Sequence, residues 1–367
     1  MWKHLRKIFL PGIILQSVLI GGGYATGREI VEYGGKFGAH GWIAGLTIFL
    51  GFTVLAFLTF EASRHYCAYD YKSLLRAMIG RGWIGYEITY LLLSIIIIAV
   101  MASAAGEILK ETLAVSPWVG VVLIVVLVGL LNYMGEDFIA LMKTIGSIAL
   151  FIAFFIFSIA VFQDRGSTMV ENFAGNDGLA LSSLGSIIWT GILYVGYNLG
   201  VYPASFFTLR SLGSRKESLA AAVIAGLLMS IPWFLTFAAL MGHYPDEQVM
   251  QAPVPWLRML SGFGRFFIVV FGVVVGWTLV ETATGVIHAF IDRVEVEYRE
   301  KAGANLGGFR RAAISTLALL LAMGLSSVGI IDLIATGYSM MAYAMIAFFA
   351  IPLLWHSPRL LNKKGSR

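Results

Sequence analysis

The sequence predicts an all-α integral membrane protein with ten transmembrane helices. Two observations indicate this fold class: the composition and the pattern of long apolar runs. Hydrophobic residues make up 58% of the 367 residues, whereas Asp, Glu, Lys and Arg together make up 13%, against about 25% in soluble domains. Mean hydropathy is +0.82. The apolar runs are long, as expected of helices that need about 20 residues to cross the hydrocarbon core.

A window of about 19 residues separates ten apolar segments. These candidate spans cover residues 8–33, 40–65, 83–109, 117–134, 136–163, 183–209, 217–242, 265–291, 309–326 and 328–355. They leave short loops and one longer connection, 243–262, where we expect small extracellular helices. Since no room remains for a separate soluble domain, we expect residues 1–367 to form a single membrane domain.

The distribution of Lys and Arg orients the spans. With the N-terminus inside, nineteen of the 26 basic residues fall on the cytoplasmic side and six fall outside, which is the bias of the positive-inside rule. Both termini are therefore expected in the cytoplasm. The basic N-terminus followed by an apolar stretch also resembles a secretory signal, but an A-x-A-like cleavage site does not follow it.

Composition also excludes several function classes. A single cysteine, Cys67, excludes an intrachain disulfide and a cysteine-rich metal centre. Only His288 of the six histidines lies well inside a span, so a haem held by paired histidines is not expected. Motifs for a nucleophile, zinc or a phosphate loop are missing, and the net charge of +5 is explained by topology. We therefore expect a protein that is not an enzyme, with no catalytic residues, no metal, no cofactor and no nucleic-acid partner.

Helix-breaking residues interrupt the first and the sixth span. They are Gly21, Gly22, Gly23 and Gly27 in the first span, and Gly196, Gly200 and Pro203 in the sixth. An interior Gly costs about 1 kcal/mol and an interior Pro about 3 kcal/mol of helix stability. Backbone that unwinds inside a membrane needs protein, water, an ion or a substrate as its partner, so these breaks predict a binding site. The alternative is that the small residues form close-packing helix faces.

The two interrupted spans are offset by five. Because five is odd, a second copy of a five-span unit inserts upside down relative to the first. We expect one repeat over residues 1–163, with spans one to five, and an inverted repeat over 183–357, with spans six to ten. Interrupted helices at matching positions of inverted halves indicate the substrate site of a secondary transporter.

The stretch GGGYATGREIVEYGGKFGAHGW, residues 21–42, resembles the first-helix signature of the YkvI-like bacterial membrane proteins, which often read G-x-G-[FY]-A-[ST]-G-x-E. That family is similar to the amino acid–polyamine–organocation (APC) superfamily. The resemblance extends over the whole chain in length and span count. It implies a LeuT-type 5+5 inverted repeat, alternating access and a place in the bacterial cytoplasmic (inner) membrane.

The predicted substrate is an amino acid or a similar small zwitterion. Helix N-termini after Gly27 and Pro203 suit a carboxylate, whereas released carbonyls, Asn198 and Glu29 suit an ammonium group. The predicted substrate-binding residues are Gly21, Gly22, Gly23, Tyr24, Ala25, Thr26, Glu29, Tyr194, Gly196, Tyr197, Asn198 and Gly200. The tyrosines also admit a nucleobase or an organic amine, or they only pack the core.

Two ionisable residues deep inside spans are candidates for ion coupling. Lys143 lies about 10 Å beyond the start of the fifth span, and Glu281 lies about 16 Å before the end of the eighth. The resemblance implies that a lysine on the fifth helix takes the place of a sodium ion, so we expect proton-coupled symport. The coupling residues would be Lys143, Glu281, Thr282 and Thr284.

Alternatives to that assignment stay open. One is a sodium site formed by Gly21, Tyr24, Glu281, Thr284 and Gly285. Another is that Lys143 snorkels to the interface and Glu281 only bonds a neighbouring helix. As a class, a channel or ligand sensor on the same scaffold competes with a transporter and predicts binding or conductance without concentrative uptake.

Arg28 and Asp332 are the predicted extracellular gate. The resemblance to LeuT-type transporters implies an Arg–Asp pair that closes the outer vestibule. Each residue is alternatively an ordinary interfacial charge, and Glu29 is an alternative partner for Arg28.

Overall fold

The computed structural model describes residues 2–134, 136–175 and 181–362, without the side chains of residues 132–145 and a few others. This part of the chain forms helices joined by turns, with no strand in it. The first half contains α1 (Trp2–Leu19), α2 (Gly22–Thr26), α3 (Arg28–Tyr33), η1 (Gly35–Gly41), α4 (Trp42–Tyr66), α5 (Tyr71–Ile79), η2 (Gly80–Gly82), α6 (Trp83–Leu113), α7 (Pro117–Met134) and α8 (Glu136–Ala174). The second half contains α9 (Leu181–Asn198), η3 (Leu199–Ser211), α10 (Arg215–Met241), α11 (Glu247–Met250), α12 (Pro255–Leu260), η4 (Ser261–Phe263), α13 (Arg265–Ala302), α14 (Gly308–Ser326), α15 (Ile330–Asp332), η5 (Leu333–Tyr338), α16 (Ser339–Met345), η6 (Ile346–Ala350) and α17 (Ile351–Asn362).

Eight helical segments of the described chain are long and apolar enough to cross a membrane. They are Gly35–Tyr66, Tyr71–Leu113, Ile148–Ala174, Ser183–Ser211, Arg215–Met241, Arg265–Ala302, Gly308–Ser326 and Ile330–Leu361. The two other predicted spans correspond to α1–α3, where the helix is interrupted, and to α7, whose apolar part Pro117–Leu131 is shorter. The connection 243–262 contains the short helices α11 and α12.

Large apolar side chains face outward along α8. The exposed set is Ile148, Phe151, Ile152, Phe155, Ile156 and Ile159. Their three- and four-residue spacing places them on one side of the helix. A continuous apolar stripe of this kind is costly in water and suits contact with lipid tails. The outward surface therefore agrees with the apolar helices in describing a multi-pass membrane protein.

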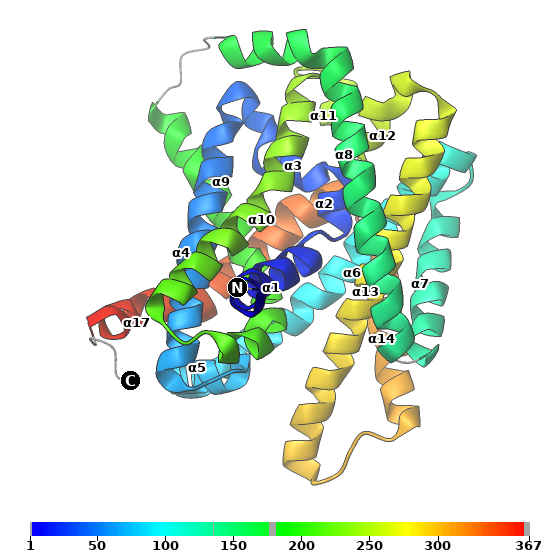
Figure 1. Ribbon diagram of the computed structural model, residues 1–367. Helices are drawn as coiled ribbons and strands as arrows, with labels where there is room; N and C mark the ends of the chain where they lie inside the picture. The colour runs from blue at the N-terminus through cyan, green and yellow to red at the C-terminus, as the bar shows by residue number, and fades with distance from the viewer. Residues whose placement is uncertain (1, 135, 176–180, 363–367) are drawn as a thin grey trace.

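The short helices α2 and α3 lie inside a ring of longer helices (Figure 1). Helix α1 packs against α10 and η3, and α2 packs against α6 and α13. Helix α3 contacts α9, α10 and η5. The interrupted first segment is thus surrounded by elements from both halves of the chain.

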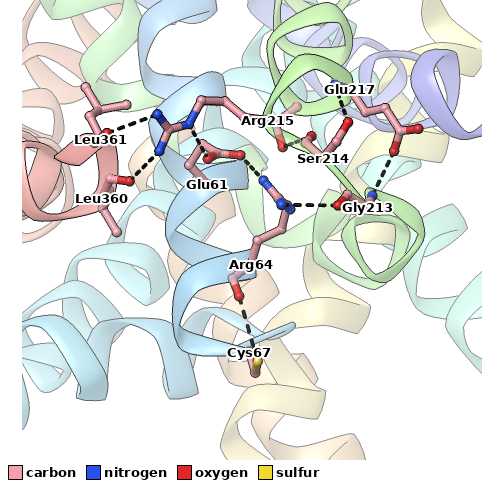
Figure 2. A network of polar contacts seen from close by, with 10 residues as sticks. Glu61, Arg64, Cys67, Gly213, Ser214, Arg215, Glu217, Leu360 and Leu361 are labelled. Carbon is pink, nitrogen blue, oxygen red and sulfur yellow. Dashed lines mark hydrogen bonds and ion pairs between the residues drawn. The ribbon is translucent and has the colours of Figure 1, made fainter. Parts of the chain in front are cut away.

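A polar network joins three elements at the predicted cytoplasmic end (Figure 2). Arg215, at the start of α10, donates hydrogen bonds to the carbonyls of Leu360 at 2.8 Å and Leu361 at 3.0 Å, in α17. Its Nε also lies 3.2 Å from the carboxylate of Glu61 in α4, which pairs with Arg64 as well. Arg215 therefore binds the end of the last helix to the body of the protein.

Candidate functional site

The first predicted span is interrupted at two points. Helix α1 ends at Leu19, and the N–H of Gly21 bonds the carbonyl of Leu19 at 2.8 Å instead of continuing the helix. Gly21 is extended, with φ −108° and ψ −159°. The chain turns again at Gly27, whose φ of +84° is readily adopted by glycine. The predicted break in the first span is therefore present, between α1 and α2 and again between α2 and α3.

The sixth span changes its winding without opening. Helix α9 runs to Asn198 and continues directly as the 3-10 helix η3, which includes Pro203. The fixed φ of proline, about −65°, lies within the 3-10 range, so tighter winding accommodates Pro203. The α-helix therefore ends inside the predicted segment, but the prediction that a helix restarts after Pro203 is wrong, and with it the carboxylate site expected there. Gly196 packs against Ile346, because a Cβ at Gly196 would lie 2.8 Å from its Cδ1.

Glu29 connects the first and the sixth span. It is buried in the first turn of α3, and its Oε2 accepts a 2.6 Å hydrogen bond from the hydroxyl of Tyr197 in α9. Its side chain folds back over α2 at Gly23, where a Cβ would come within 2.9 Å of the Cγ of Glu29. The absence of a side chain at Gly23 therefore allows the carboxyl group to occupy this position.

Tyrosine rings from three elements surround this carboxyl group. The ring centroid of Tyr197 lies 4.6 Å from that of Tyr338 in η5, 5.4 Å from that of Tyr194 and 5.7 Å from that of Tyr33 in α3. Tyr33 also donates a 3.3 Å hydrogen bond to the carbonyl of Ile334. The rings thus form one packed cluster across α3, α9 and η5.

A cavity of about 60 Å³ borders Glu29. Its polar and small lining residues are Gly21, Glu29, Tyr90, Ser94, Tyr197, Asn198, Gly200, Thr282 and Tyr338. A larger vestibule of about 360 Å³ lies against it and shares six lining residues with it. Because a water molecule takes up roughly 30 Å³ in the liquid, the small cavity suits an ammonium-sized group, whereas the vestibule suits the body of a small solute.

Arg293 lines the vestibule on α13, toward the predicted cytoplasmic end. Its guanidinium lies 3.4 Å from the ring centroid of Tyr90 and 4.0 Å from that of Tyr71. Its Nη1 also lies 3.1 Å from Oε2 of Glu87 in α6. These contacts hold the Arg293 guanidinium in the vestibule wall, ion-paired with Glu87 and stacked on two tyrosine rings.

The predicted coupling residues fall in two places. Glu281, Thr282 and Gly285 line the vestibule, whereas Thr284 does not and donates its hydroxyl to the carbonyl of Val280 at 2.7 Å. The Glu281 side chain lies directly against Gly146 of α8, closer than a Cβ there would allow. Lys143 lies in α8 three residues before Gly146, but its side chain is outside the described part of the structure.

The predicted gate between Arg28 and Asp332 is not formed. Nη1 of Arg28 donates to the carbonyls of Met250 at 2.7 Å and Ala252 at 3.3 Å. Nη2 lies 3.6 Å from Glu32, while the Asp332 side chain is exposed. Peptide carbonyls of the α11–α12 segment accept hydrogen bonds from Nη1, while the buried Nε has no hydrogen-bond partner in the described part of the chain. Arg28 thus binds that segment instead of the tenth span.

The remaining predicted binding residues pack around the site without lining the cavity. Tyr24, Ala25 and Thr26 are fully buried, and the Thr26 hydroxyl donates to the carbonyl of Gly23 at 2.7 Å. Tyr194 belongs to the tyrosine cluster. The surroundings of Gly22 lie outside the description. Of the alternative sodium set, Gly21 reaches the small cavity and Glu281 and Gly285 the vestibule, while Tyr24 and Thr284 line neither.

Three polar residues that line the small cavity are not predicted by the sequence. Tyr90 and Ser94 lie one turn apart on α6, and Tyr338 lies in η5. The only sequence signal for the first two was a pair of polar side chains, four residues apart, inside an otherwise apolar run. Tyr338 follows Gly337 in a segment that the sequence alone assigned to an uninterrupted helix.

Comparison with known proteins agrees with this architecture. No family model matches the chain. An uncharacterised membrane protein, YkvI of Bacillus subtilis (strain 168), is 23% identical over 348 residues, which are 94% of each chain. The predicted resemblance to YkvI-like membrane proteins is confirmed.

Two solved transporters share the fold. A Na+-coupled sialic acid symporter is 12% identical with a TM-score of 0.56, over 96% of this chain and 86% of that chain. The manganese transporter of Eremococcus coleocola, in complex with an aromatic bis-isothiourea substituted compound, is 16% identical with a TM-score of 0.56, over 100% of this chain and 83% of that chain. The chain therefore shares the fold of these two solved proteins.

Proposed function

We propose that this protein is a secondary active transporter that moves small amino acids or related ammonium-bearing solutes by alternating access. One observation carries the proposal. Buried Glu29, from the interrupted first span, meets Tyr197 of the sixth span at a small cavity that adjoins a vestibule. In this account ten spans form a 5+5 inverted repeat, over residues 1–163 and 183–357, in the bacterial inner membrane with both termini in the cytoplasm.

The chemistry of the small cavity favours an ammonium group. Glu29 supplies a negative charge, and the rings of Tyr197 and Tyr338 supply π faces that attract cations. The amide nitrogen of Asn198 donates to the carbonyl of Tyr194 at 2.8 Å, so its oxygen stays available as an acceptor. Organic amines are the second candidate class, because the described residues that line this cavity include no basic side chain for a carboxylate.

The coupling ion in this proposal is the proton, held by Lys143 and Glu281. Support comes from the position of Glu281, whose side chain lies against Gly146, one turn from Lys143. A lysine in a membrane interior is costly when charged and unpaired. The protonation of Lys143 can therefore change with the conformation of the transporter. Sodium is the alternative ion, with Glu281 and Gly285 among its ligands.

The described conformation fits an inward-facing state. The vestibule runs toward Arg293, in the direction of the predicted cytoplasmic end. On the opposite side, Arg28 binds the carbonyls of Met250 and Ala252. In alternating access these contacts break when the outer side opens.

Uptake into proteoliposomes tests the function. We expect concentrative, saturable uptake of members of a panel of amino acids and organic amines under an imposed proton gradient, and loss of that uptake in Lys143→Ala. Uptake driven by sodium alone favours the sodium alternative. Binding of panel members without concentrative uptake under either gradient identifies a ligand sensor and contradicts a transporter.

A further inference from the structure

Glu29 has no cationic partner in the described part of the protein. Its side chain accepts a 2.6 Å hydrogen bond from Tyr197, with the Tyr194 hydroxyl and the Tyr24 backbone also beside it, and is only 5% exposed as a residue. The neighbouring Arg28 points away, toward the carbonyls of Met250 and Ala252 and toward Glu32. By contrast, Glu61 is equally buried but pairs with two arginines.

The groups around Glu29 are polar without being charged. Its titratable neighbours are Tyr24 of α2, Tyr33 of α3, Tyr194 and Tyr197 of α9, and Tyr338 of η5. Helix α6 contributes Tyr90 and Ser94 to the adjoining cavity, and α13 contributes Thr282. Helices α10 and α12 face this region with Trp233 and Trp256, which pack on Gly34 and Gly27.

A lone ionised carboxylate in such surroundings is strongly disfavoured, because hydrogen bonds from a few neutral groups do not replace its lost hydration. Either a proton or a cation must therefore accompany it. The cavity of about 60 Å³ at its side has room for an ammonium group. The rings of Tyr197 and Tyr338, with an interplanar angle of 31°, line this cavity and offer π faces to such a cation.

We propose that Glu29 holds a proton in the empty transporter and the solute's ammonium group in the loaded one. This inference rests on the proposed function and deepens it. When R-NH3+ enters, the Glu29 carboxyl proton passes to water in the vestibule, and the carboxylate that remains pairs with the ammonium. Proton and solute thus exclude each other at one carboxylate. Solute and proton are therefore exchanged at Glu29, as a step separate from the coupling proton that the proposed function assigns to Lys143 and Glu281.

Infrared difference spectroscopy of the purified full-length protein tests the exchange, with methylammonium chloride as the probe. At neutral pH we expect a carbonyl band of a neutral carboxylic acid, which Glu29→Gln removes. Glu61→Gln is the matched control and leaves the band, because Glu61 is ion-paired. Methylammonium should abolish the band, whereas sodium chloride at the same ionic strength should not.

Tyr197→Phe provides a second, spectroscopic readout that does not depend on Glu29→Gln folding well. Loss of the hydroxyl donor should move the band to higher frequency without removing it. The inference is overturned if Glu29→Gln retains the band, if methylammonium leaves it unchanged, or if only sodium removes it.

The two hypotheses fail separately. If the protein shows concentrative uptake in proteoliposomes but Glu29→Gln retains the band, the exchange is contradicted and the transport function is supported. If the band disappears with Glu29→Gln and with methylammonium, but the protein takes up no solute, the proton and ammonium site is supported and the transport function is contradicted.

Discussion

The hydroxyl of Tyr197 lies 2.6 Å from Oε2 of Glu29 and donates a hydrogen bond to it. This contact joins residues that are 168 positions apart and belong to the first and the sixth predicted span. It is a direct hydrogen bond between the two spans that the sequence singled out. The contact also borders the small cavity. We therefore expect a solute bound in this cavity to contact both spans.

Tyr197→Phe should weaken solute binding. Hydrogen bonds to charged groups are worth about 1.5–3 kcal/mol, which corresponds to roughly tenfold to 150-fold in affinity. Tyr202→Phe is the control, because its hydroxyl bonds the carbonyl of Phe52 at 3.2 Å and does not line the cavity. Calorimetric titration with a transported solute measures both variants. Equal affinities in the two variants would contradict the role of Tyr197.

Gly23→Ala should displace the Glu29 carboxyl group. The added Cβ would overlap the folded-back side chain of Glu29, and overpacking of this kind costs about 1–3 kcal/mol. We expect a lower melting temperature and loss of uptake. Gly129→Ala is the matched control, because no atom lies within 4 Å of a Cβ there, and it should be neutral or stabilising. A Gly23→Ala protein with normal uptake would show that the carboxyl position is unimportant.

Arg28→Gln should loosen the α11–α12 segment. The substitution removes donors to the carbonyls of Met250 and Ala252, and unsatisfied buried polar groups cost about 1–3 kcal/mol each. Hydrogen exchange of residues 247–260 should rise by roughly tenfold or more. Lys36→Gln, which removes a half-exposed ion pair with Glu32 and a cation–π contact with Phe37, should leave it unchanged. Similar exchange in both variants would rule out Arg28 as the tie to this segment.

Arg215→Ala should release the end of α17. Two backbone carbonyls lose their guanidinium donor, and a net hydrogen bond is worth about 1 kcal/mol, or roughly fivefold in exchange. Amide hydrogens of residues 351–361 should exchange faster, with no change in α11 and α12. Lys216→Ala alters an exposed neighbour and serves as the control. If both variants exchange alike, α17 is held by its apolar packing.

The first break was predictable from sequence, and the state of the sixth span was not. Gly21, Gly22 and Gly23 leave α2 with little intrinsic helix stability, and the turn at Gly27 needs a positive φ that glycine tolerates. For the sixth span, the sequence predicts a break at Pro203 because proline disrupts an α-helix. A 3-10 helix accepts the same φ, and helix type depends on packing that sequence periodicity does not report.

Long-range partners escaped prediction for a related reason. Arg28 was assigned to Asp332 by resemblance, yet it binds carbonyls of residues more than 220 positions away. Backbone carbonyls carry no residue identity, so no sequence pattern reveals them as partners. Glu29 and Tyr197, by contrast, stood out as polar groups beside breaks, where the cost of burial demands a partner.

A density map of the protein with a transported solute bound tests the central claim most directly. The account predicts solute density in the small cavity, with its ammonium group at hydrogen-bond distance from the Glu29 carboxylate and beside the rings of Tyr197 and Tyr338. Solute density elsewhere, with no solute atom at hydrogen-bond distance from Glu29, would contradict it.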